Sequence, residues 1–510
     1  MSATGSIRRV DDCLSMSTGS THTPSSALEH DEIELKLEID PESMDRFAAT
    51  EMLSGLTPKI IHQVSTYFDT PDQDLRAAGL SLRVRTAGGR HVQTIKAGGG
   101  AAAGLFARPE WEHDVAGLEP DIRLGSPIYA LVGHETLAKI KPAFTVTITR
   151  RQWVIEHDGG TVELVADTGS ITAIDRVTPI SELELELKGG SPTAIFALAN
   201  TLGEAIPLRL GVLTKAERGY RLIGPATLDA VNAERLELAA DTTTAEAFAQ
   251  IAGTCLRHFR LNETILRRGP DPEALHQTRV ALRRLRSALS IFKQVVADDR
   301  FPHLASELKW LAGSLGPARD LDVLRARLGS AVNEKLIAAH ADAYTAALDA
   351  LDSQRTRDLM IALVEWTALG TWRVQPADPE TVNAPVALFA DAVIGALRRR
   401  MKRRGHDLDH LDDEARHRIR IIAKKLRYAT GFFQSLYTRK PDRRRFKTFT
   451  RHLEALQDHL GILNDLATAP ALMERFGLDQ EASLPSAERQ QILSDATEAY
   501  ERLIAAKRFW

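Results

Sequence analysis

The chain has 510 residues, of which 44% are hydrophobic and 6% aromatic, and its formal net charge is −3. This length exceeds what one hydrophobic core supports, so we expect two or three domains. No apolar run reaches the roughly 18 residues of a membrane-spanning helix. The only two cysteines, Cys13 and Cys255, exclude a disulfide framework or a cysteine zinc site. We therefore expect a cytoplasmic protein without a membrane partner.

The charge is divided unevenly along the chain. Residues 241–510 hold 42 Lys and Arg against 35 Asp and Glu, whereas residues 1–240 hold 23 against 33. An acidic half joined to a basic half predicts two domains with different tasks.

The acidic half begins with a tail, residues 1–28, which is rich in Ser, Thr and Gly and which we expect to be disordered. Residues 29–223 then show the period-two alternation of β-strands. The expected strands are Glu32–Ile39, Gln63–Thr70, Leu80–Thr86, His91–Lys96, Arg108–Asp114, Phe144–His157, Thr161–Asp167 and Glu182–Leu187. Hairpin turns are expected at Gly88-Gly89 and Asp158-Gly159. The predicted fold class is α+β, and it begins with an eight-stranded antiparallel β-barrel wide enough for one small ligand.

Several of these strands concentrate charge on one face. Glu32, Glu34, Lys36 and Glu38 share a face of the first strand, because alternate residues point the same way. Like charges on one face of an open sheet repel each other. A barrel with a polar interior can instead hold anions, cations and metal ions together, and we predict such an interior.

The basic half, residues 245–510, shows helical periodicity, and residues 224–244 are expected to be a linker. A proline-containing break separates two repeats, at about 245–370 and 385–510. The segment His276–Arg286 matches His417–Arg427 at an offset of 141 residues, and two further matches occur at an offset of 145. We therefore predict an all-α bundle with an internal two-fold repeat.

Each repeat carries basic residues at positions i, i+3, i+7 and i+10, which fall within roughly an 80° arc of a helix. The two stripes are His276, Arg279, Arg283, Arg286 and His417, Arg420, Lys424, Arg427. Neither stripe contains an acid, so a regular polyanion is the expected ligand. No stacking aromatics or recognition helix accompany the stripes, which favours inorganic polyphosphate over nucleic acid. Arg319 and Arg445, from the other matched segments, are assigned to the same ligand.

Together these motifs resemble two known families. The first half is similar to the CYTH superfamily of triphosphate tunnel enzymes and the second to the CHAD domain, whose signature is the paired His-x-x-Arg helices. The motifs of the first are Glu32-x-Glu34-x-Lys36, Tyr67-Phe-Asp69-Thr, Leu82-Arg83-Val-Arg85, Thr94-Ile-Lys96, Arg108-x-Glu110-x-Glu112, Arg150-x-x-Trp153, Asp167-x-Gly169, Glu182-x-Glu184-x-Glu186 and Lys215-x-x-Arg218-Gly. The order of the two domains resembles bacterial CYTH–CHAD inorganic triphosphatases. The resemblance implies hydrolysis of inorganic tripolyphosphate in the first domain and binding of long-chain polyphosphate, and hence association with polyphosphate granules, by the second.

Roles for single residues follow from this resemblance and from charge. Phosphate oxygens would be held by Lys36, Arg83, Arg85, Lys96, Arg150 and Lys215. Mg²⁺ or Mn²⁺ would be held by Glu32, Glu34, Glu184 and Glu186. Lys36, Glu110 and Glu112 are the expected catalytic residues. The sequence leaves open whether Glu110 and Glu112 orient the attacking water or bind a second metal ion, and whether Lys215 is a tunnel cation or a capping residue.

Two other functions compete with this prediction. One is a CYTH enzyme that acts on thiamine triphosphate or a nucleoside triphosphate, including ATP as a cyclase substrate. The other is a non-catalytic protein that only binds polyphosphate. The complete set of acids favours a hydrolase, because a binding module does not need metal ligands.

Overall fold

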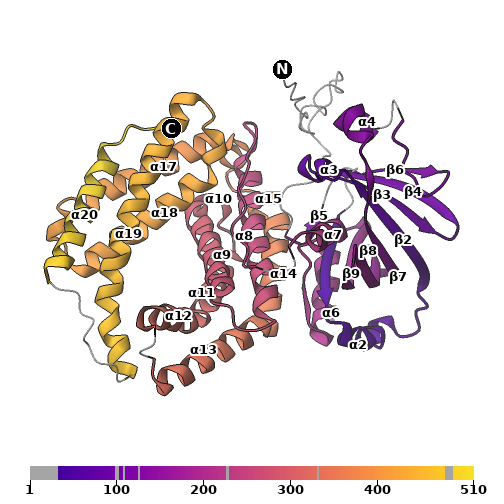
Figure 1. Cartoon of the computed structure of the whole chain (residues 1–510), viewed down its shortest axis with the longest axis horizontal. Coiled ribbons are helices and arrows are strands. Elements are labelled where there is room, and N and C mark those ends of the chain that lie inside the picture. Colours follow the sequence, from indigo (N-terminus) through magenta and orange to yellow (C-terminus); the bar gives the residue numbers. More distant parts are fainter. Residues whose placement is uncertain are drawn as a thin grey trace. The chain divides into compact units, whose positions relative to one another are not determined.

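The computed structural model describes residues 33–97, 103–106, 110–123, 127–225, 229–329, 332–476 and 486–510. The chain forms two compact units, one of Met1–Asp229 with Asp352–Glu365 and one of Ala230–Leu351 with Trp366–Trp510 (Figure 1). The predicted tail 1–28 and the predicted metal ligand Glu32 lie outside the described residues.

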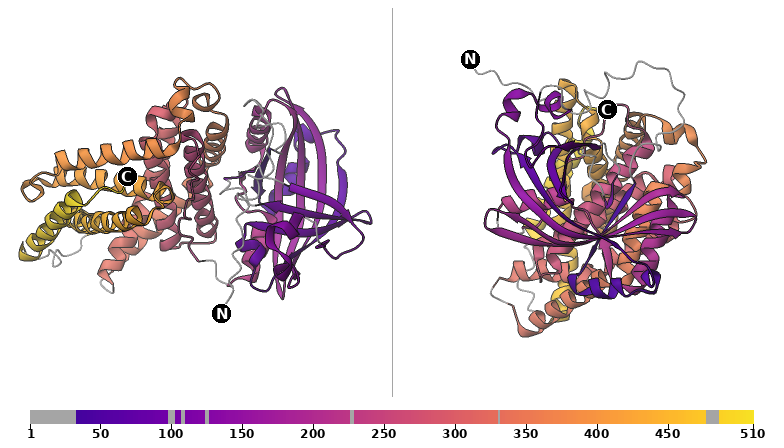
Figure 2. Two further views of the ribbon diagram at one scale, coloured as in Figure 1. Left: turned by 90° about the horizontal axis from the view of Figure 1, so that it is seen from above. Right: turned by 90° about the vertical axis from the view of Figure 1, so that its right-hand side faces the viewer.

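The first unit is built on one antiparallel sheet. Its strands are β1 (Glu34–Ile39), β2 (Lys59–Asp69), β3 (Leu80–Ala87), β4 (Arg90–Ala97), β5 (Leu105–Phe106), β6 (Glu110–Val115), β7 (Lys141–His157), β8 (Gly160–Ala173), β9 (Arg176–Gly190) and β10 (Leu208–Leu210). They lie in the order β10-β1-β9-β8-β7-β2-β3-β4-β6, and β5 also pairs with β1. The long strands curl round into a half-barrel (Figure 2).

The predicted fold class, an antiparallel curled sheet followed by a helical domain, is confirmed, with a correction to the strand count. The sheet has ten strands rather than eight. The two extra strands, β5 and β10, are two and three residues long, too short to show alternation. Within the described residues, no pairing joins β6 to β10, so this part of the sheet is an open half-barrel and not a closed one.

The predicted hairpins form as expected from their turn residues. Asp158 and Gly159 have φ angles of 44° and 75°, and Gly88 and Gly89 have φ angles of 56° and 79°. Positive φ at both central residues matches the right-handed twist of the strands that the turn connects. These turns fix the register of β3 against β4 and of β7 against β8.

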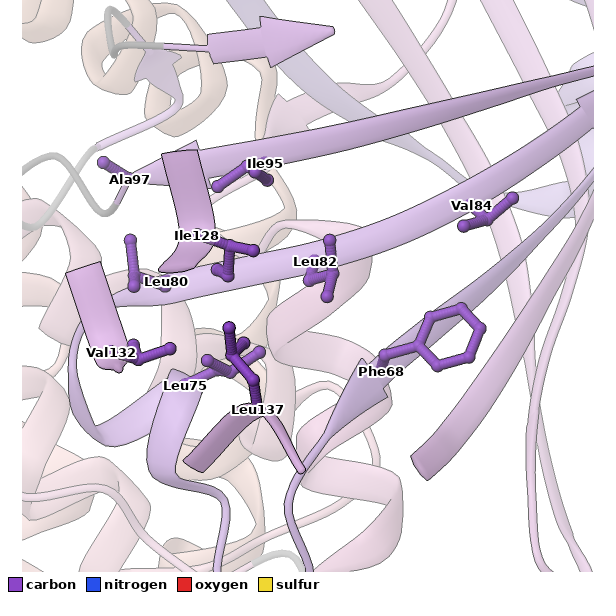
Figure 3. Close-up of a cluster of buried hydrophobic side chains, with 10 residues drawn as sticks. All are labelled: Phe68, Leu75, Leu80, Leu82, Val84, Ile95, Ala97, Ile128, Val132 and Leu137. Atoms are coloured by element: carbon purple, nitrogen blue, oxygen red, sulfur yellow. The ribbon is translucent and has the colours of Figure 1, made fainter. Parts of the chain in front are cut away.

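Helices cover one face of the sheet. The short helices α3 (Asp74–Ala77), α4 (Pro127–Val132) and α5 (His134–Leu137) pack on the apolar side of β2, β3 and β4. Figure 3 shows this cluster, in which Leu75, Ile128 and Leu137 meet Leu82 and Ile95. Elsewhere on the sheet, α6 (Thr193–Ala205) packs on β7, β8 and β9, and Phe47 of α2 (Met44–Ala48) meets Trp153 of β7 edge-on. Burial of these apolar side chains fixes which face of each strand remains for polar groups.

The second unit is helical. Its main helices are α8 (Thr244–Leu266), α9 (Pro272–Ile291), α10 (Lys293–Val296), α11 (Phe301–Ser314), α12 (Gly316–Leu328), α13 (Glu334–Asp352), α15 (Thr371–Val374), α16 (Pro379–Asn383), α17 (Val386–Arg404), α18 (Asp413–Phe432), α19 (Lys440–Phe476) and α20 (Ser486–Ala505). Helix α14 (Gln354–Leu369) belongs to the first unit as far as Glu365 and to the second from Trp366 onward. The two stripe segments each form one helix, α9 and α18. Asp271 and Asp412 cap these helices by accepting from the backbone N–H of Ala274 and Ala415, so the repeat extends to the helix starts. None of the helices that the structure describes is long and apolar enough to cross a membrane.

Candidate functional site

The sheet register gathers the predicted charged residues on the face that is not covered by α3 to α6. Residues directly opposite each other on neighbouring strands project from the same face. The opposed pairs are Lys36 and Glu184, Glu182 and Asp167, Asp167 and Arg150, Tyr67 and Arg83, Arg83 and Thr94, Thr94 and Glu112, and Lys96 and Glu110. One charged surface therefore runs across eight strands, from β1 to β6.

Three carboxylates, two of them buried and one partly buried, form the acidic centre of this face. Asp167 and Glu182 are 0% and 1% exposed, and oxygen atoms of these two residues and Glu184 lie within 4.8 Å of one another. The Lys215 Nζ lies 2.7 Å from Asp167, 2.5 Å from Glu182 and 2.8 Å from Glu184. Lys36 Nζ lies 3.3 Å from Glu182 and also contacts Glu184. The two ammonium groups of Lys36 and Lys215 thus offset part of the negative charge of the acidic centre.

The pKa values show how strongly these charges depend on each other. Burial acts to raise the pKa of Glu184, but Lys215 and Lys36 hold it well below its usual range. Burial acts to lower the pKa of Lys36, but Glu182 and Glu184 hold it well above its usual range. All of these groups are therefore charged near neutral pH.

Arg150 holds the acidic centre from the neighbouring strand. Its Nε and Nη2 donate to the two oxygens of Asp167 at 2.8 and 2.7 Å, and Nη2 also donates to Glu184 at 2.7 Å. This two-pronged contact fixes the plane of the Asp167 carboxylate.

A second charged group lies on β3, β4 and β6. Arg85 Nη2 is 3.2 Å from Glu112, and Lys96 Nζ is 2.5 Å from Glu110. Thr94 donates its hydroxyl to Glu112 at 2.7 Å. Burial acts to raise the pKa of Glu112, but the Thr94 hydrogen bond and Arg85 lower it, so this carboxylate is ionised. Arg83 approaches both acids, at 3.9 and 4.0 Å.

Helix α7 (Lys215–Ile223) carries Lys215 to the acidic centre. Thr214 caps this helix, so Lys215 itself is a cation of the charged face and not the capping residue. The Tyr220 hydroxyl donates to Asp69 at 2.7 Å. A Cβ at Gly219 would lie 2.2 Å from the Phe144 ring, which explains why the motif Lys215-x-x-Arg218-Gly ends in glycine. Arg218 adds a contact to Glu182 at 3.2 Å.

The metal ligands expected from the sequence do not all meet. Glu184 belongs to the acidic centre. Glu34 lies beside it, 3.2 Å from the Lys36 ammonium group that also contacts Glu184, whereas Glu186 contacts Lys188. Sequence reasoning missed Asp167 and Glu182 as candidate ligands. The available signals were the motif Asp167-x-Gly169 and the alternation of Glu182 with Glu184, and the pairing of β8 with β9 then brings Asp167 opposite Glu182.

In the helical unit, the two predicted stripes face each other. Lys425 of α18 donates to Ser290 of α9 at 2.7 Å, which joins the two helices. Burial, and then the guanidinium groups of Arg420 and Arg283, lower the pKa of Lys424 to about 8. Because Arg283 belongs to α9 and Lys424 to α18, the stripes form one basic surface.

The two stripes contain no acid, but acids from neighbouring helices do approach this surface. Asp320 of α12 and Asp465 of α19 are close enough to influence each other and the stripes: burial raises the pKa of Asp320, Arg279 lowers it, and Asp465 raises it. These acids come from neighbouring helices, so helical spacing within α9 or α18 could not reveal them.

The remaining predicted polyphosphate ligands lie around this surface, with the exception of Arg445. Burial and then Arg319 lower the pKa of His276, which places Arg319 beside the first stripe. His417 bonds to Asn464 at 2.8 Å, Arg427 donates to Gln457 at 3.2 Å, and Arg286 is exposed. Arg445 lies twelve residues before Gln457 on α19, which is about 18 Å along the helix.

Comparisons with known proteins agree with both units. The CYTH domain family matches residues 30–220 and the CHAD domain family matches residues 250–474. An inorganic triphosphatase of Haemophilus influenzae is 30% identical over 196 residues, which cover 38% of this chain and 54% of that protein. An uncharacterised protein of Mycobacterium tuberculosis is 31% identical over 191 residues, which cover 31% of this chain and 34% of that protein. The crystal structure of the CHAD domain from the plant Ricinus communis is 33% identical, with a TM-score of 0.43, over 55% of this chain and 93% of that one. The chain thus spans about half or less of the length of the Haemophilus influenzae and Mycobacterium tuberculosis proteins.

Proposed function

The chain is a CYTH–CHAD protein, and from this premise we propose that its sheet unit hydrolyses inorganic tripolyphosphate with the help of a divalent metal ion. The observation that supports this proposal is the arrangement of charges on the face of the sheet that carries Lys36, Arg83 and Arg150. The carboxylates at one side of this face fit a metal ion. The Arg and Lys side chains at the other side fit the anionic substrate to which the metal ion is bound.

Asp167, Glu182 and Glu184 are the residues that would hold the metal ion. They fit it because carboxylate oxygens are the ligands that Mg²⁺ and Mn²⁺ prefer and because their oxygens lie within 4.8 Å of one another. Lys215 Nζ lies among the same oxygens, so the ion and the ammonium group would compete for them. A metal ion bound there would neutralise phosphate charge and make bound water more acidic.

The cations of the face would hold the phosphate chain. Arg83 and Arg85 present guanidinium groups for two-pronged contacts with phosphate oxygens, and Lys96 adds a point charge. Glu112, held ionised by Thr94 and Arg85, is the candidate to accept a proton from the attacking water. Catalysis would then consist of positioning and charge neutralisation, which are the main requirements of phosphoryl transfer.

Phosphate release from tripolyphosphate, ATP and thiamine triphosphate, each with Mg²⁺, Mn²⁺ or EDTA, tests this proposal and the competing substrates. We expect metal-dependent release that is fastest from tripolyphosphate. Release from tripolyphosphate that is no faster than in EDTA contradicts the enzyme proposal. Faster release from ATP or thiamine triphosphate contradicts the substrate assignment.

We further propose that the helical unit binds long-chain polyphosphate. The supporting observation is the meeting of the two basic stripes, whose repeated spacing suits a regular polyanion. Binding to the full chain in EDTA should weaken steeply with salt, because neutralised phosphates release counterions. Duplex DNA should bind more weakly, and equal binding of DNA would contradict the assignment.

A further inference from the structure

A cavity of about 560 Å³ lies at the start of α19, and its lining is strongly basic. The lining residues are Lys440, Pro441, Arg444, Arg445, Thr448 and Lys507. Four of these six side chains are cations, and no acid is among them. The volume falls in the range of small-molecule binding sites.

This basic cavity is separate from the stripes. Helix α19 runs antiparallel along α18, since His417 contacts Asn464 and Arg427 contacts Gln457. Arg445 is the cavity residue whose predicted ligand was polyphosphate, and it lies about 18 Å along α19 from Gln457. A ligand in the cavity would therefore occupy a different site from a chain lying along the stripes.

The chain's final residues are fastened so that Lys507 reaches the cavity. Phe509 packs edge-on against Tyr437, Phe446 and Phe449. Arg398 donates to the carbonyl oxygens of Ile504 and Ala506 at 2.6 and 2.9 Å. Lys507 lies between these two anchors, so its position is built into the fold and is not that of a loose chain end.

Nearby acids compensate the charges of the basic cavity only in part. Asp442 is buried, and it contacts Arg439 at 2.6 Å and Arg445 at 3.9 Å. Among the residues that the structure describes, no carboxylate forms an ion pair with Lys440, Arg444 or Lys507. Like charges brought together repel each other, and a multivalent anion would offset that cost.

We propose that the basic cavity binds a short inorganic polyphosphate, of the size of pyrophosphate or tripolyphosphate, as a second anion site of the helical unit. Its cations converge on a compact space, whereas the stripes extend along two helices and suit a long chain. Arg444 and Arg445 supply two-pronged contacts, the two lysines supply point charges, and Thr448 supplies a hydroxyl donor. This site does not depend on hydrolysis in the sheet unit.

Lysine acetylation of the full chain, measured residue by residue by mass spectrometry, tests the proposal. With tripolyphosphate in EDTA, we expect Lys440 and Lys507 to be acetylated at least about threefold more slowly than in sulfate of equal ionic strength. Lys447 is the internal control, because it is exposed on the same helix but does not line the cavity. Equal slowing of all three lysines, or equal slowing in sulfate, would show general screening and overturn the proposal.

Two variants sharpen this experiment. Arg444→Gln should abolish the protection of Lys440 and Lys507, whereas Arg443→Gln, an equal loss of charge outside the lining, should preserve it. Loss of protection in both variants would contradict a defined site. Protection by long-chain polyphosphate but not by tripolyphosphate would contradict the short ligand. Glu184→Gln should retain the protection even though hydrolysis is lost, which separates this proposal from the proposed triphosphatase activity.

Discussion

The two units handle charge in opposite ways. On the sheet, Lys36, Arg150 and Lys215 each contact at least one buried carboxylate, and burial fails to lower the pKa of Lys215 because Asp167 and Glu182 raise it. On the facing helices, burial and neighbouring cations lower the pKa of Lys424. A metal-bound anion can exchange partners with the sheet's own ions, whereas the helical surface has few acids of its own, Asp320 and Asp465 among them, and gains further balancing charge from an anionic ligand.

The strongest test of this contrast is removal of one carboxylate from the balanced sheet. Glu184→Gln keeps the side-chain size but removes an anion that contacts Lys36, Arg150 and Lys215. We expect the turnover of tripolyphosphate to fall by about a hundredfold or more, because a hard metal ligand is lost. Initial rates of phosphate release at saturating metal measure this effect.

Glu156→Gln is the matched control. Glu156 is exposed on β7 and bonds only to Thr161 among the contacts that the structure describes. Its turnover should equal that of the unchanged chain. If Glu184→Gln also retains near-normal turnover, Glu184 is not a metal ligand.

The next test removes charge from the unbalanced helices. Arg283→Glu combined with Arg427→Glu reverses one cation in each stripe, and we expect long-chain polyphosphate affinity to fall about thirtyfold with a flatter salt dependence. Titration of the full chain in EDTA measures both. Hydrolysis by the sheet should remain unchanged.

Lys309→Glu combined with Arg451→Glu controls for net charge. Both residues are exposed helical cations outside the stripes, one in each repeat. An equal loss of affinity in this control would show that overall charge, not the stripe, determines binding.

The charged strand faces of the sheet unit and the basic stripes of the helical unit could be predicted from the sequence, because both depend on the spacing of residues within one strand or helix. Alternation placed Lys36 and Glu34 on one strand face, and helical spacing placed Arg279 and Arg283 on one stripe. Glycine-containing turns such as Asp158-Gly159 gave the hairpins, since few other residues adopt the required φ.

The rest depends on contacts between distant segments. Asp167 joins the acidic centre only because β8 pairs with β9, and Lys215 reaches it only because Tyr220 docks α7 on Asp69. Asp320 and Asp465 approach the stripes from other helices. No periodicity within one element carries such information.

A smaller effect is expected from Lys215→Gln, which removes the ammonium group from among the three carboxylates. In the absence of substrate, Mn²⁺ should bind about tenfold more tightly, because the ion no longer competes with Lys215. Turnover should fall, since a cation that meets the substrate is lost. Electron paramagnetic resonance of free Mn²⁺ measures affinity without relying on activity.

Lys188→Gln provides the comparison, because Lys188 contacts Glu186 and approaches Glu163, two acids outside the acidic centre. Its Mn²⁺ affinity should stay unchanged. Weaker Mn²⁺ binding by Lys215→Gln would show that Lys215 supports the metal site instead of competing for it.

The smallest expected effect is a pH dependence of polyphosphate binding that arises from Lys424. Its neighbours are Arg420 on its own helix, Arg283 and Arg279 on α9 and Asp465 on α19, and burial with these cations lowers its pKa to about 8.

A bound polyanion favours the protonated amine and so raises this pKa, which means that binding above pH 8 takes up a proton. Affinity should therefore be full below pH 8 and fall above it, by at most about tenfold per pH unit. Lys424→Arg should remove this decline between pH 8 and 9.5, because a guanidinium group stays charged. Lys425→Arg, at a neighbouring position that bonds to Ser290, should keep it. A decline that persists in Lys424→Arg would assign the titration to another group and would leave Lys424 outside the polyphosphate surface.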